Sequence, residues 1–190
     1  MPRLAVLVGS MLFVSLSALA QTPRIEVSAG YTLFDYYQQS APKLKMNGWT
    51  AGADVNLRRW FSVVADISGA YKTQSSTDPT VNGTKTRIYN YLFGPRLYPL
   101  RHRRISPFAE YLLGRSGLHI SGPAVPPLPA LNLSGSGFTW AVGGGADVTL
   151  THRFALRGQA DFVRTSFFGG SPSQNNGRIC VALLYRMKQK

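Results

Sequence analysis

Two carboxylates that are suited to ion pairing lie in unusual surroundings in this chain. Asp54 and Asp66 fall among small and apolar residues in the segment GWTAGADVNLRRWFSVVADISGAY, residues 48–71. Apolar and polar residues alternate on both sides of Arg59 and Trp60, and alternate side chains of a strand point to opposite faces of a sheet. The segment therefore predicts two strands joined by a short turn, with both carboxylates on the polar faces.

The same test of alternation, applied to the whole chain, places most acidic residues and several arginines on polar faces. These residues are Glu26, Asp54, Arg58, Asp66, Arg96, Glu110, Asp147, Arg157, Asp161, Arg178 and Arg186. A buried charge is costly unless it is paired and hydrogen-bonded. If the polar faces point to an enclosed interior, we therefore expect a network of ion pairs and hydrogen bonds, whose partners the sequence does not assign.

A lipid-modifying enzyme is the other chemistry that these residue types could support. His119 lies near Ser116 and Ser121, and Glu110 precedes them on the same run. A nucleophile, its base and an orienting carboxylate must lie within hydrogen-bond reach of one another. Glu110 is several residues further along the strand, so we expect no enzyme.

No metal or cofactor site is predicted either. His102 and His152 fall in separate turns, which leaves no set of metal ligands. The glycines of GGGADV precede no helix, so they do not form a phosphate-binding loop. The single cysteine, Cys180, has no partner for a disulfide within the chain.

Eight alternating runs follow one another, and nothing between them has a helical pattern. Their connections alternate between long and short, and the longest is the Pro- and Gly-rich segment from about Leu118 to Gly137. Each run has roughly the 9 to 11 residues that a tilted strand needs to cross a bilayer. The pattern predicts an all-β fold: an eight-stranded antiparallel up-and-down transmembrane β-barrel with short periplasmic turns and longer outer loops.

Aromatic residues are expected to form two belts on the apolar face of this barrel. Near the loop ends of the runs lie Tyr31, Trp49, Tyr71, Tyr89, Phe138, Trp140 and Phe162, and toward the turn ends lie Phe61, Tyr98, Phe154 and Tyr185. Amphipathic rings of this kind collect where a barrel meets the headgroup regions of a bilayer. The alternative is a soluble lipocalin-like barrel, in which the apolar face points inward.

The N-terminus and the charge indicate an exported protein. Residues 1–20 have the composition of a secretory signal peptide cut after Ala20, and residues 21–190 form the barrel domain; an uncleaved membrane anchor is the alternative. The formal net charge of +13 favours an anionic membrane surface over nucleic acid as a partner. We expect basic residues near the outer rim to meet lipopolysaccharide phosphates: Lys43, Lys45, Lys72, Lys85 and Arg87.

Several motifs resemble those of a known family. GWTAGADVN, GPRLYP, PFAEYLLGRSG, GGGADV, ALRGQADFVRT and RICVALLYRM are similar to segments of the small outer-membrane β-barrels akin to the OmpA transmembrane domain and OmpX. The resemblance implies a monomer in the bacterial outer membrane. It also implies a structural or surface-interaction role, with an extracellular partner bound through the outer loops.

An eight-stranded interior is just wide enough for side chains to fill it, so we expect a plugged lumen. A narrow pore or carrier for small molecules is the alternative.

Overall fold

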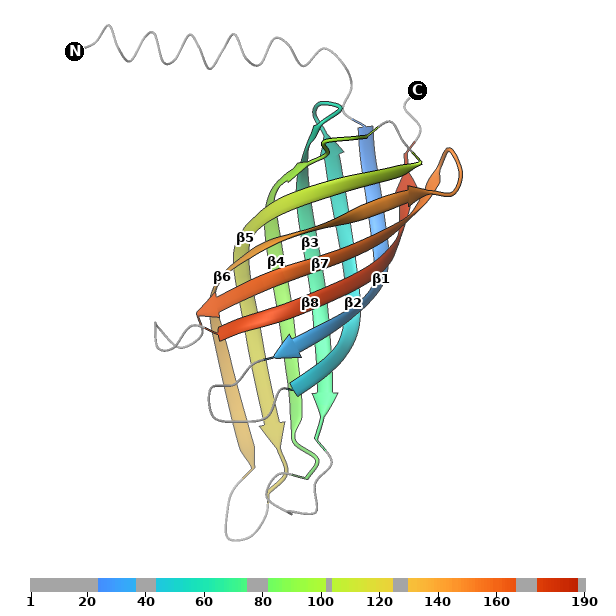
Figure 1. Cartoon of the computed structure of the whole chain (residues 1–190). Helices are drawn as coiled ribbons and strands as arrows, with labels where there is room; N and C mark the ends of the chain where they lie inside the picture. Colours follow the sequence, from blue (N-terminus) through green and yellow to red (C-terminus); the bar gives the residue numbers. More distant parts are fainter. Residues whose placement is uncertain are drawn as a thin grey trace, which may run out of the picture.

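The computed structural model is a closed antiparallel barrel, and it describes residues 24–36, 44–74, 82–101, 104–124, 130–166 and 174–187 (Figure 1). The strands are β1 (Arg24–Tyr36), β2 (Leu44–Asn56), β3 (Phe61–Thr73), β4 (Lys85–Leu97), β5 (Ile105–Gly122), β6 (Leu131–Thr149), β7 (Phe154–Ser166) and β8 (Gln174–Arg186). Each strand pairs with the next, and β8 closes the barrel against β1. The predicted all-β, eight-stranded, up-and-down fold is confirmed. The expected signal peptide lies outside the described residues.

No helix within the described ranges is long and apolar enough to cross a membrane.

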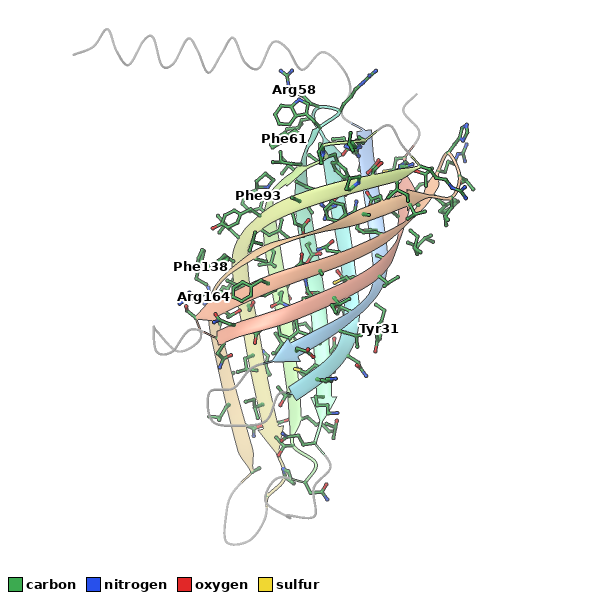
Figure 2. The ribbon with its side chains drawn as sticks, in the orientation of Figure 1. Tyr31, Arg58, Phe61, Phe93, Phe138 and Arg164 are labelled. Atoms are coloured by element: carbon green, nitrogen blue, oxygen red, sulfur yellow. The ribbon has the colours of Figure 1, made fainter. Side chains whose placement is uncertain are left out.

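Burial alternates along the strands as the sequence pattern requires. On β4, the outward Phe93 is 63% exposed, whereas the inward Arg96 is 1% exposed. Figure 2 shows Tyr31, Phe93 and Phe138 on the outer wall of the barrel. The apolar face therefore points outward and the charged face inward, which is the reverse of a lipocalin-like barrel.

One expectation about the connections is wrong. The segment from Leu118 to Gly137 is not a loop throughout, because β5 continues to Gly122 and β6 begins at Leu131. Alternation persists there, with Leu118 buried and His119 exposed. Continuous pairing with the partner strand overrides the weak strand propensity of Gly and Ser.

The extended hairpin reaches beyond its neighbours in the barrel. Pairing between β6 and β7 begins at Phe138 with Ser166, so residues 131–137 pair with β5 alone. In Figure 1 the β3–β4 and β5–β6 hairpins extend past the ends of β1, β2, β7 and β8 at the loop end of the barrel.

Hydrogen-bonded turns close the opposite end of the barrel. The backbone N–H of Arg58 donates to the carbonyl of Phe61 over 3.0 Å between β2 and β3. Between β6 and β7, Thr151 Oγ1 accepts a bond of 3.0 Å from the N–H of Phe154, as in the short turns that hydroxyl side chains favour.

Candidate functional site

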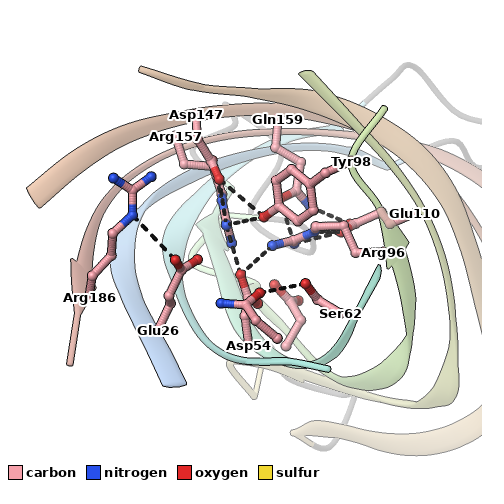
Figure 3. A network of polar contacts seen from close by, with 12 residues as sticks. Glu26, Asp54, Ser62, Arg96, Tyr98, Glu110, Asp147, Arg157, Gln159 and Arg186 are labelled. Carbon is pink, nitrogen blue, oxygen red and sulfur yellow. Dashed lines mark hydrogen bonds and ion pairs between the residues drawn. The ribbon is translucent and has the colours of Figure 1, made fainter. Parts of the chain in front are cut away.

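The inward charges form a connected network, and Arg96 lies at its centre (Figure 3). Arg96, on β4, donates through Nε to Glu110 Oε2 of β5 over 2.7 Å. Its Nη1 donates to Asp54 Oδ2 of β2 over 2.6 Å. All three side chains are almost completely buried. A charge at this depth requires such partners, because water does not solvate it.

Arg157, on β7, extends the network across the lumen to the same carboxylate. Its Nη2 donates to Asp54 Oδ2 over 2.7 Å, and its Nε donates to Asp147 Oδ1 of β6 over 2.7 Å. Asp54 therefore bridges two arginines from different strands. Tyr98 completes this layer by donating its hydroxyl to Asp147 Oδ2 over 3.1 Å and accepting from Arg157 Nη2 over 3.0 Å.

A second layer lies nearer the loop end and is held by Arg178 of β8. Arg178 donates to Asp161 Oδ2 over 2.8 Å and also pairs with Asp66. Gln159 joins the two layers, because its Nε2 donates to Glu110 Oε1 over 2.7 Å and to Asp161 Oδ2 over 2.9 Å. The interactions are thus continuous through the middle of the lumen.

The turn end of the lumen contains a member that the sequence analysis missed. Glu26 accepts from Arg186 Nε over 3.3 Å and from Arg101 Nη2 over 2.9 Å. Arg101 lies in the turn after β4, where alternation along a strand gives a side chain no predicted direction. It lies over the ring of Tyr98, with 4.1 Å between the guanidinium carbon and the ring centroid. The long side chain reaches back to a carboxylate and an aromatic face, both of which attract a cation.

Arg58 does not join the network. It is exposed in the turn after β2, which ends at Asn56, and Figure 2 shows it at the turn end of the barrel. Alternation predicts a side chain's direction only as far as the strand continues, so the prediction for Arg58 is wrong.

Tyr98 is also misplaced by the sequence analysis. It is expected in the outer aromatic belt but is only 2% exposed and lies inside the barrel. Tyr98 follows Arg96 by two residues, so alternation along the chain predicts that its side chain points inward, as that of Arg96 does. Its ring packs against Phe108, with centroids 5.7 Å apart, and Arg96 stacks over Phe108 at 4.4 Å.

On the loop side of the second layer, uncharged polar side chains form hydrogen bonds with one another. Thr139 Oγ1 donates to Ser116 Oγ over 2.7 Å, and Ser116 Oγ donates to Asn90 Oδ1 over 2.6 Å. Beyond them, buried apolar side chains fill the lumen: Phe34, Met46, Ala70, Ile88 and Leu118. This apolar layer was not predicted, although its residues continue the inward parity of their strands.

A small cavity lies among the charged layers. Its volume is about 10 Å³, and Asp54, Asp66, Arg96, Arg157 and Gln159 contribute to its lining. That volume accommodates roughly one water molecule. The side chains that line this cavity therefore leave room there for little more than one water molecule.

The residues considered for lipid hydrolysis are not brought together. Ser116 faces inward and bonds to Asn90, and Glu110 is buried against Arg96. His119 and Ser121 are exposed on the outer wall, so no carboxylate of the candidate set lies with them. Among the described residues, no group of three or more His, Cys, Asp or Glu side chains is placed to hold a metal ion.

A closed barrel with an apolar outer wall and a charged, filled interior is the architecture of small outer-membrane proteins. Residues 6–186 match the family model of the outer membrane protein beta-barrel domain. The chain belongs to this family. The match confirms the family that the sequence motifs indicated, and the protein is a bacterial outer-membrane barrel.

Solved structures share the fold of this outer-membrane barrel at low sequence identity. Ail, the attachment invasion locus protein of Yersinia pestis, is 15% identical with a TM-score of 0.61, and the match covers 88% of this chain and 100% of Ail. Neisserial surface protein A is 11% identical with a TM-score of 0.65, and the match covers 87% of this chain and 97% of that protein. OprG from Pseudomonas aeruginosa is 8% identical with a TM-score of 0.54, and the match covers 89% of this chain and 98% of OprG. No match was found among curated proteins.

Proposed function

We propose that this outer-membrane barrel is a closed, non-enzymatic platform that presents its outer loops and the extended β5–β6 hairpin for surface interactions. The observation that carries the proposal is the continuous network through the lumen. Ion pairs join both Arg96 and Arg157 to Asp54, and the cavity between the layers is only about 10 Å³. An aqueous channel needs a continuous open path, and ion pairs that cross the lumen in two layers favour a closed barrel over an open one.

The rigidity of such a barrel suits the display of outer segments. Binding residues commonly lie on loops that a rigid scaffold positions. The β5–β6 hairpin is part of that scaffold, since its outer residues are paired in register from Ser116 with Gly137 to Gly122 with Leu131. The hairpin thus presents a structured surface beyond the membrane wall.

Export and removal of residues 1–20 belong to the same proposal. A mature chain that begins at Gln21, found by N-terminal sequencing of protein from outer membranes, supports this step. A chain that retains Met1 in the outer membrane contradicts it.

Trimming the hairpin tests the platform. Residues 121–132 are replaced by Asn-Gly, a pair that closes two-residue hairpins, between the opposed Ile120 and Leu133. A crystal structure of Ail contains a heparin analogue, sucrose octasulfate, which makes immobilised heparin a defined first probe. The removed segment, SGPAVPPLPALN, carries no charge but contains the side-chain donors Ser121 and Asn132. We expect wild type to be retained and the trimmed variant, which lacks these donors, to elute slightly earlier, while both keep the shift in electrophoretic mobility on boiling that marks a folded barrel.

Equal retention of the two proteins contradicts a role for the hairpin. A pore is the second candidate, and stable ion conductance of the purified protein would favour it.

A further inference from the structure

A groove lined by polar and apolar residues lies on the outer wall at the loop end of the barrel, away from the lumenal network. Its volume is about 420 Å³, within the usual range of roughly 300 to 1,000 Å³ for ligand pockets. We call this the rim groove, and its outward-facing lining consists of Arg87, Tyr89, His119, Ser121, Asn132 and Ser134. These side chains come from β4, β5 and β6.

Strand register sets hydrogen-bond donors in a row across the groove. Arg87 lies opposite His119, and His119 lies opposite Ser134. In the next row outward, Lys85 lies opposite Ser121, which lies opposite Asn132. Neighbouring strands are about 4.8 Å apart and alternate residues about 6.6 Å apart, so one anionic group can reach several of these donors.

The hydrogen-bond donors of the rim groove are available to a ligand. Arg87 and His119 are exposed, and Arg87 forms no ion pair with a carboxylate of the described residues. Its Cα partners across the sheet are Tyr71 and His119, neither of which is acidic. This contrasts with the lumen, where the buried arginines are paired.

Aromatic residues place the groove at the level of lipid headgroups. Tyr89 lies on the same face of β4 as Arg87, two residues closer to the turn end of the barrel. Its ring packs edge-on against that of Tyr71, with ring centroids 5.8 Å apart. Trp49 donates through Nε1 to the hydroxyl of Tyr71 over 3.0 Å. Such amphipathic rings mark the boundary between hydrocarbon and headgroups, and Tyr71 is the register partner of Arg87, so the row that contains Arg87 lies at that boundary.

We infer that the rim groove binds a phosphate group of lipopolysaccharide in the outer leaflet. Arg87 contacts the phosphate through its planar guanidinium, a geometry that suits two parallel hydrogen bonds to phosphate oxygens. His119 and Ser134 supply further donors, and the ring of Tyr89 packs against the adjoining sugar. The inference rests on the outer-membrane location and on the basic rim, and it does not depend on a closed lumen.

Binding of purified lipopolysaccharide to the detergent-solubilised full-length protein tests the inference. The double variant Arg87→Gln, His119→Gln removes the two central side chains of the rim groove. Lys72→Gln is the control, because Lys72 lies at the same height on β3, opposite Thr86. By the alternation of β3, its side chain lies on the other face of the sheet. Because hydrogen bonds to charged groups are the stronger ones, we expect affinity to fall about tenfold or more in the double variant. Lys72→Gln should change the affinity by less than about twofold, since Lys72 lies on the other face of the sheet from the rim groove.

Lipopolysaccharide treated with phosphatase identifies the recognised group. It should bind wild type about as weakly as the intact lipid binds the double variant. Equal affinity of the double variant and wild type, or an equal loss in Lys72→Gln, overturns the site, and undiminished binding of the dephosphorylated lipid overturns phosphate recognition. The mobility shift on boiling shows that each variant is folded. Conductance of the same samples tests the closed lumen separately.

Discussion

Asp54 accepts hydrogen bonds from two arginines on different strands, and both arginines reach the same oxygen atom. The contacts measure 2.6 Å to Arg96 Nη1 and 2.7 Å to Arg157 Nη2. Two guanidinium groups at this depth would repel each other without the carboxylate between them. Its charge therefore holds together strands that lie far apart in the sequence.

Replacing Asp54 with Asn removes the carboxylate that two buried arginines share, so that, among the described residues, Arg96 keeps only Glu110 and Arg157 keeps only Asp147 as a charged partner. We expect the free energy of unfolding to fall by about 3 to 5 kcal/mol, as is typical when one partner of a buried pair is removed. Denaturant unfolding in lipid vesicles, followed by tryptophan fluorescence, measures the change. As a control, Arg58→Gln in the exposed turn should stay within about 0.5 kcal/mol of wild type. A loss below about 1 kcal/mol in Asp54→Asn would show that the network tolerates the missing charge.

Tyr98 gives a test of a neutral member of the network. Tyr98→Phe removes the hydroxyl that donates to Asp147 over 3.1 Å, and we expect a cost of about 1 to 3 kcal/mol because a buried acceptor and a buried donor lose a partner. Tyr91→Phe is the matched control, since Tyr91 is exposed on the outer wall. The same unfolding experiment compares the two, and equal stabilities would place Tyr98 outside the network.

At the scale of the strands, two glycines of one hairpin occupy opposite environments. A Cβ added to Gly143 on β6 would overlap the Asp161 side chain and the Ala160 carbonyl, whereas a Cβ added to Gly158 on β7 meets nothing within 4 Å. The backbone at Gly143 thus makes room for a buried carboxylate, and Gly158 has no such role.

Gly143→Ala and Gly158→Ala should therefore change stability in opposite directions. We expect Gly143→Ala to cost about 1 to 3 kcal/mol through overpacking. Gly158→Ala should gain about 0.4 to 1 kcal/mol, because alanine restricts the unfolded chain more than glycine does. Thermal unfolding in detergent ranks the variants, and a stable Gly143→Ala protein would show that β6 and β7 shift apart at little cost.

Alternation along the strands was enough to predict the barrel and to place most lumenal charges. It failed where strand boundaries decide the outcome: Arg58 lies past the end of β2, and the β5–β6 hairpin extends through residues rich in Gly and Ser. Ion-pair partners could not be read from sequence, because barrel closure brings Asp54 next to Arg157, 103 residues away. Arg101 was missed because its position in a turn gives no parity, and only the fold shows that it reaches Glu26.

For the whole molecule, charge is divided between the inside and the outside of the barrel. Within the described ranges, six acidic residues are buried in the lumen and five arginines pair with them. The lumen is thus close to neutral, so most of the net charge of +13 belongs to turns, loops and the outer rim. A neutral, crosslinked interior suits a plug, and a basic exterior suits an anionic membrane surface.

Ion conductance of the purified wild-type protein in planar lipid bilayers tests the closed lumen most directly. The sample is first shown to be folded by its mobility shift on boiling. Since side chains fill the lumen and ion pairs cross it, we predict no stable single-channel steps over the background of the bilayer. Reproducible steps of one amplitude, with a defined ion selectivity, would contradict the closed lumen and identify the protein as a narrow pore.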